Sequence, residues 1–128
     1  SLRARLLACA PHAIKIASIV EAELRLGAQK SKDKHRAASA VAAFLAPYEI
    51  VAFCTRGAHR YAEIRAELER KGQRIGANDM VLAATVVAHE GRLVTNNTRE
   101  LGRVVGLHCE DWIEDDPPAR GRRRGAAK

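Results

Sequence analysis

The chain has 128 residues, of which 47% are hydrophobic, so it is long enough for one domain with a modest core and too apolar for a disordered chain. The net charge of +7 favours a nucleic-acid partner, but residues 117–128 hold five of the 22 basic residues and no acid, which leaves 17 basic and 15 acidic residues elsewhere. No apolar run of about 18 residues predicts a membrane span, and three widely spaced cysteines without a CxxC motif argue against a disulfide framework and favour the cytoplasm.

The basic C-terminal segment, PPARGRRRGAAK (117–128), is rich in Pro, Gly and Arg. A segment of this composition buries too little apolar surface to fold, so we expect a disordered Arg-rich tail behind a folded domain over residues 1–116. An alternative is that the tail grips RNA through its phosphates.

The first predicted strand is IKIAS (14–18), which is short and β-branched. Ser18 and Glu21 have the spacing of a capping box, so we expect a helix over residues 19–26 that ends at Gly27. A second helix is predicted over residues 35–45, where apolar residues recur at helical spacing.

The middle of the chain predicts a second strand and a long helix. EIVAF (49–53) has the composition of a short strand. Residues 55–71 place Tyr61, Ile64 and Leu68 on one stripe of a helix, and the following glycine is expected to end it.

The last third predicts one more helix between strands. Asn78 is expected to cap a helix over residues 79–90. RLVT (92–95) predicts a third strand, residues 96–104 a turn with a short helix, and GLHCEDW (106–112) a last strand. Because strands alternate with helices, the sequence predicts an α/β fold with one parallel sheet covered on both faces.

Polar side chains fall at the strand ends and helix starts of this predicted sheet. Glu23 lies early in the helix after the first strand, Asp79 opens the last long helix, and Asn96 and Asn97 directly follow the third strand. Ligands of open α/β sheets gather at the carboxyl ends of the strands, where two carboxylates and an amide oxygen suit Mg²⁺ or Mn²⁺. Each residue also has an ordinary interpretation: Glu23 as a solvated acid, Asp79 as a partner of the helix dipole, and Asn97 as a turn or cap residue.

Other catalytic motifs do not occur in the sequence. His89 and Glu90 are not followed by the second histidine of a zinc protease, and there is no GxSxG, GxxxxGK[ST] or GxGxxG. The hard-cation site is therefore the chemistry that the pattern favours.

The chain resembles VapC-type toxins of the PIN-domain family. The resemblance rests on four blocks in order: AEL with a following glycine (22–27), FLAPYEIVAF (44–53), YAEIRAELERKGQRIGANDMVLAA (61–84) and LVTNNTRELGRVVGLHCEDW (93–112). It implies a PIN-like three-layer α/β/α fold with a central parallel sheet, and Mg²⁺- or Mn²⁺-dependent endoribonuclease activity on tRNA or other structured RNA. It further implies a homodimer and a cognate antitoxin protein, with no membrane partner.

The family's site residues map onto Glu23, Asp79 and Asn97 as metal ligands and catalytic residues. Two departures accompany this match. The family's opening strand, which ends in a metal-binding Asp, has no counterpart here, so we expect a fold without that first strand, and Cys54 stands where relatives often carry Asp.

Three hypotheses follow. The first is a PIN-domain ribonuclease toxin. The second is a catalytically impaired toxin fragment that retains only dimer or antitoxin binding. The third is an RNA-binding module that acts through the Arg-rich tail.

Overall fold

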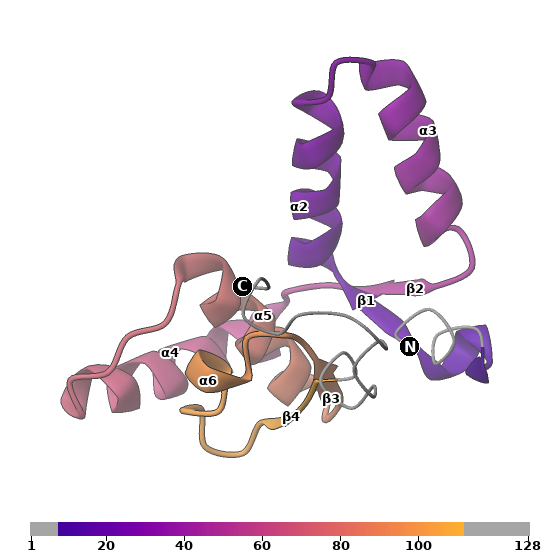
Figure 1. Cartoon of the computed structure of the whole chain (residues 1–128). Helices are drawn as coiled ribbons and strands as arrows, with labels where there is room; N and C mark the ends of the chain where they lie inside the picture. The colour runs from indigo at the N-terminus through magenta and orange to yellow at the C-terminus, as the bar shows by residue number, and fades with distance from the viewer. Residues whose placement is uncertain (1–7, 112–128) are drawn as a thin grey trace, which may run out of the picture.

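The computed structural model describes residues 8–111, which form an α/β chain with parallel strands (Figure 1). The predicted tail at 117–128 and the end of the predicted last strand lie outside the described residues. The elements in chain order are η1 (Pro11–Ala13), β1 (Lys15–Ala17), α2 (Ser18–Gln29), α3 (Lys34–Leu45), β2 (Glu49–Val51), α4 (Thr55–Arg70), α5 (Ala77–Ala88), β3 (Arg92–Val94), α6 (Thr98–Leu101) and β4 (His108–Glu110).

The helix α2 follows β1 without a loop and differs from the prediction at both ends. Its N-cap residue is Ala17 and no side chain caps it, so the predicted capping box is wrong; Glu21 instead pairs with Arg25 at 2.8 Å. The helix also continues through Gly27 to Gln29. The following residue, Ala28, is buried in α2, which packs on α3, and this packing outweighs the low helix propensity of glycine.

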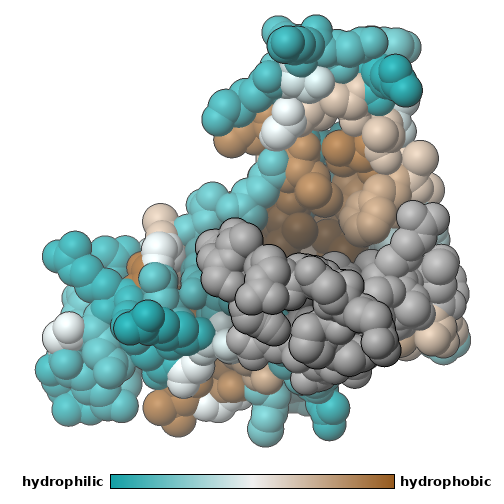
Figure 2. Space-filling model, viewed as in Figure 1, coloured by the Kyte–Doolittle hydropathy of each residue, from teal (hydrophilic) through white to brown (hydrophobic). Residues whose placement is uncertain are grey.

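The helices α2 and α3 form a hairpin that projects from the rest of the molecule (Figure 1). The start of α3 is fixed by Asp33, whose side chain accepts a hydrogen bond from the Arg36 N–H at 3.0 Å. Figure 2 shows a hollowed apolar face beneath this hairpin. Leu26 and Phe44, on the two hairpin helices, are 56% and 46% exposed.

Away from the α2–α3 hairpin, the helices α4 and α5 pack against each other and form the main helical layer. The prediction for α4 is confirmed: Gly72 adopts a φ of +70°, a left-handed conformation that glycine tolerates and that ends the helix. The helix α5 starts two residues earlier than predicted, because Gly76 occupies the N-cap position and Asn78 lies within the first turn.

The predicted single sheet is not continuous over residues 8–111. The strands β1 and β2 form one parallel pair, and β3 and β4 form another, with no ladder between the two pairs. The helix α5 packs on both β1 and β3, so these two strands are the inner ones of the two pairs. The prediction of parallel strands is correct, and the prediction that one sheet carries all four is wrong for the described chain.

The core lies between α4, α5 and the β3–β4 pair. Its buried members are Leu68, Met80, Ala83, Leu93, Leu101 and Val104. Met80 and Ala83 belong to α5, so one face of this helix is packed into the core. This packing fixes the rotation of the helix about its axis and therefore the direction in which Asp79 points. Over the described range, no helix combines the length and apolarity that crossing a membrane requires.

Candidate metal-binding site

The three predicted site residues come from three elements. Glu23 lies on α2, Asp79 in the first turn of α5, and Asn97 directly before α6 at the end of the loop that follows β3. The strands β1 and β3 both lead into this region with their carboxyl ends. The fold therefore brings the three residues to the same end of the two strand pairs.

The closest pair is Asp79 and Asn97. The Asn97 Nδ2 donates a hydrogen bond to the Asp79 Oδ2 at 2.8 Å, and both residues are half-buried. The Thr95 hydroxyl accepts from the Asn97 N–H at 3.1 Å, which fixes the turn between β3 and α6. Asn97 is the N-cap residue of α6 by position, but its side chain makes no capping bond and its Nδ2 donates to Asp79 instead.

Glu23 is held by a neighbour that the sequence did not assign to the site. The Asn78 Nδ2 donates to the Glu23 Oε2 at 2.9 Å across the space between α5 and α2. The prediction that Asn78 caps α5 is wrong, since no side chain caps this helix. The sequence indicates a site role for Asn78 only through its position directly before Asp79. The residue that Asn78 binds, Glu23, is 55 residues away along the chain.

Two amide–carboxylate pairs thus meet at the start of α5. Asn78 and Asp79 are adjacent residues of this helix and bind different parts of the chain. Asn78 binds Glu23, on the helix that follows β1, and Asp79 binds Asn97, in the loop that follows β3. Within residues 8–111, no three His, Cys, Asp or Glu side chains gather closely enough to hold a metal ion by themselves. The described donor set is therefore two carboxylates and an amide oxygen.

This donor set fits a hard divalent cation. Each hydrogen bond uses the amide nitrogen, so the Oδ1 of Asn97 and one oxygen of each carboxylate carry no hydrogen bond among those found between described residues. Oxygen donors of this kind suit Mg²⁺ or Mn²⁺, which keep several waters in their coordination shell. Asp79 and Asn97 are half-buried, whereas Glu23 is exposed.

Cys54 lies at a different strand end and does not join this site. It occupies the N-cap position of α4 and is exposed. The N–H groups of Gly57 and Arg56, together with the charge of Arg56, lower the pKa of the Cys54 thiol below its ordinary value. Cys54 is therefore a helix-start residue outside the candidate site.

The model of the PIN domain family matches residues 2–107. The chain belongs to the PIN-domain family. The match covers the PIN-domain chain from before β1 to the loop before β4, so it includes Glu23, Asp79 and Asn97.

Individual relatives support the same assignment. This PIN-domain chain is 43% identical over 99 residues to "Ribonuclease VapC2" of Rickettsia felis, with 77% of this chain and 74% of the relative covered. It is 38% identical over 97 residues to "tRNA(fMet)-specific endonuclease VapC" of Salmonella typhimurium, covering 76% and 74% of the two chains. The crystal structure of VapBC2 from Rickettsia felis, bound to a DNA fragment from their promoter, superposes with a TM-score of 0.78 at 41% identity over 87% of this chain and 83% of that chain.

The resemblance inferred from the sequence blocks is confirmed by these comparisons. The predicted PIN fold and the predicted ribonuclease class are confirmed as well. The roles of Glu23, Asp79 and Asn97 stay predictions, now with a described geometry.

Proposed function

We propose that this chain is the endoribonuclease of a toxin–antitoxin pair, that it requires Mg²⁺ or Mn²⁺, and that it cleaves tRNA or another structured RNA. The observation that carries the proposal is the pair of hydrogen bonds that ties Glu23 and Asn97 to the first turn of α5. The two bonds bring Glu23 of α2 and Asn97 of the loop after β3 to the first turn of α5, which supports an oxygen-donor site of the kind that a metal-dependent phosphodiesterase requires.

In this proposal Asp79, Glu23 and Asn97 hold the cation. A bound Mg²⁺ or Mn²⁺ activates water and stabilises the charge that develops on a phosphodiester. Asn97 keeps the Asp79 carboxylate in one orientation through the 2.8 Å hydrogen bond. Asn78 does the same for Glu23, whose side chain is otherwise exposed.

The proposal includes protein partners. The VapBC2 structure similar to this chain carries in its name a second component beside VapC, so we propose a cognate antitoxin for this chain too. We also propose a homodimer acting in the cytoplasm, as the family resemblance implies. Copurification of the chain with the product of a neighbouring gene tests the first partner, and light scattering tests the second.

A cleavage assay tests the activity. Purified protein is incubated with total tRNA and 5 mM Mn²⁺, Mg²⁺ or EDTA, and fragments are resolved on a denaturing gel. We expect cleavage with either cation, none in EDTA, and loss of cleavage in Asp79→Asn and Glu23→Gln. The matched control is Glu63→Gln, which removes an acid that pairs with Arg60 on the exposed face of α4 and is expected to cleave normally. Cleavage in EDTA or by Asp79→Asn would contradict the metal mechanism.

A catalytically impaired protein that only binds its antitoxin or a second copy is the alternative function. The observation that favours it is that only two carboxylates reach the site within residues 8–111. Two negative charges offset a divalent cation but add little to overcome the dehydration that Mg²⁺ resists. Antitoxin binding without cleavage in either cation would establish this alternative.

A further inference from the structure

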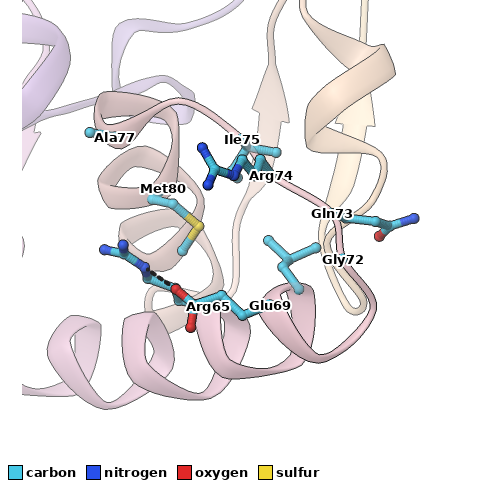
Figure 3. Close-up of a pocket in the computed structure, with 9 residues that line it drawn as sticks. Arg65, Glu69, Gly72, Gln73, Arg74, Ile75, Ala77 and Met80 are labelled. Atoms are coloured by element: carbon cyan, nitrogen blue, oxygen red, sulfur yellow. Dashed lines mark hydrogen bonds and ion pairs between the residues drawn. The ribbon is translucent and has the colours of Figure 1, made fainter.

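A second concave site lies beside the start of α5. It is a cleft of about 500 Å³ between the C-terminal half of α4 and the loop that leads into α5 (Figure 3). Leu68, Ile75 and Met80 supply its apolar lining, while its charged lining residues are Arg65, Glu69 and Arg74. A cavity of about 150 Å³ already holds benzene, so this cleft has room for a planar ring system with polar substituents.

The guanidinium of Arg65 is fixed in place along one wall. It pairs with Glu69 at 2.9 Å and donates to the Tyr61 hydroxyl at 2.7 Å. The carboxylate of Glu69 also offsets its charge, so Arg65 acts as a flat, oriented surface more than as a free cation.

The guanidinium of Arg74 has no such partner. Among residues 8–111 no hydrogen bond or ion pair involves its side chain, although its backbone carbonyl accepts a hydrogen bond from Arg103 Nη1. That bond anchors the loop to the segment after α6. Figure 3 shows the Arg65 and Arg74 side chains reaching toward Met80 from different sides of the cleft. The loop is therefore anchored, and no described residue pairs with the Arg74 guanidinium that it carries.

The cleft and the candidate metal site share one helical turn. Met80 lines the cleft, and Asp79, the preceding residue, faces Asn97. Their Cα atoms are about 3.8 Å apart, as in any trans peptide. The two sites therefore adjoin along the chain at the first turn of α5.

We propose that this cleft binds one unstacked nucleobase of a single-stranded RNA segment next to the cleaved phosphodiester, with Arg65 and Met80 against the ring and Arg74 on the adjoining phosphate. Single-stranded RNA is bound in this way elsewhere, through bases that stack on guanidinium planes and phosphates that pair with free cations. The proposal rests on the proposed ribonuclease function and adds a substrate-binding site to it.

Binding of a fluorescein-labelled single-stranded RNA dodecamer, measured by anisotropy in EDTA, tests the cleft without cleavage. Arg74→Ala is expected to weaken binding about tenfold and to lower the salt slope by about 0.7, the value for one phosphate contact. Ala77→Leu narrows the cleft without a change of charge and keeps helix propensity, so we expect weakening of about fivefold at an unchanged salt slope. The matched control is Arg70→Ala, which removes the same charge from an arginine that pairs with Glu67 outside the cleft, and its effect is expected to be below twofold.

The possible results distinguish failure of the cleft proposal from failure of the proposed ribonuclease function. A parent protein that cleaves RNA, together with Arg74→Ala and Ala77→Leu variants that bind as Arg70→Ala does, would overturn the cleft proposal and leave the ribonuclease function standing. A parent protein that binds no dodecamer would overturn the cleft proposal, while absence of tRNA cleavage with either cation would overturn the ribonuclease function. Normal RNA binding by the two cleft variants with loss of antitoxin binding would assign the cleft to a peptide and refute the nucleobase site.

Discussion

Replacing Asn97 with Asp converts a hydrogen-bond donor beside Asp79 into a second carboxylate. In the structure the Asn97 amide donates to the Asp79 Oδ2 at 2.8 Å, so the variant loses a hydrogen bond to a charged group, worth about 1.5–3 kcal/mol. It also places two like charges about 4 Å apart, which adds up to about 4 kcal/mol of repulsion at an effective dielectric constant near 20. Both groups are half-buried and the new side chain can rotate away, so the expected cost without metal is about 2–3 kcal/mol.

Thermal unfolding measures this cost. The fall in Tm equals the loss of unfolding free energy divided by the unfolding entropy, which is about 2.1 cal/mol/K per residue. For 128 residues, a loss of about 3 kcal/mol therefore lowers Tm by about 11 °C in EDTA. A divalent cation bound between the two carboxylates removes their mutual repulsion, and the new carboxylate at position 97 is a charged ligand for it. The variant is therefore expected to bind Mn²⁺ about tenfold more tightly than the parent protein. At saturating Mn²⁺ this adds about 1.4 kcal/mol, or about 5 °C, beyond the rise of the parent protein.

The matched control is Asn96→Asp. This residue is exposed and adjacent to Asn97, and it is expected to leave Tm within about 2 °C in either condition because an exposed substitution changes stability by less than about 0.5 kcal/mol. If Asn97→Asp unfolded at the parent temperature in EDTA, or gained no more from Mn²⁺ than Asn96→Asp, the assignment of this pair as a metal site would be refuted.

Three further predictions concern the support of the site and the cysteines. Leu101→Ala removes a fully buried side chain of α6 and is expected to lower the free energy of unfolding, measured by urea titration, by about 3–4 kcal/mol. The control Val105→Ala, at a position 75% exposed, is expected to lower it by less than about 1 kcal/mol. Equal effects of the two substitutions would contradict the burial of Leu101 in the core. Asn78→Ala releases the carboxylate that it holds on α2 and is expected to weaken Mn²⁺ binding about fivefold by calorimetry with Tm changed by less than 3 °C; unchanged affinity would refute its positioning role. Iodoacetamide at pH 7 is expected to modify Cys54 before Cys109, since backbone N–H groups lower the pKa of the first thiol and burial raises that of the second; mass spectrometry that finds Cys109 modified first would reverse this order.

The sequence predicted helices well where their ends depend on local chemistry. Gly72 ends α4 as expected because its φ of +70° suits glycine, and this requirement is local. Gly27 was expected to act in the same way, yet α2 continues through it. Its neighbour Ala28 is buried, and this tertiary contact holds the backbone helical.

The roles of the candidate site residues stay predictions, and the sequence did not predict the hydrogen bonds between them. Asp79 and Asn97 are candidates because each stands at a helix start or directly after a strand, where the ligands of open α/β sheets gather. The role of Asn78 depends on Glu23, which only the fold brings near, so its local preference for capping was the misleading signal. Strand pairing failed for a similar reason: alternation of strands and helices indicates parallel direction but does not specify which strands share a ladder.

The separation of the two strand pairs has a consequence for the cooperativity of the molecule. No backbone ladder within residues 8–111 joins β1–β2 to β3–β4, so contacts of α5 and its two side-chain hydrogen bonds couple the halves. Amide hydrogens of the two pairs are then expected to exchange with solvent as two separate opening units, and those of α5 to be the slowest. A cation held by Glu23, Asp79 and Asn97 would bridge both units and merge them into one.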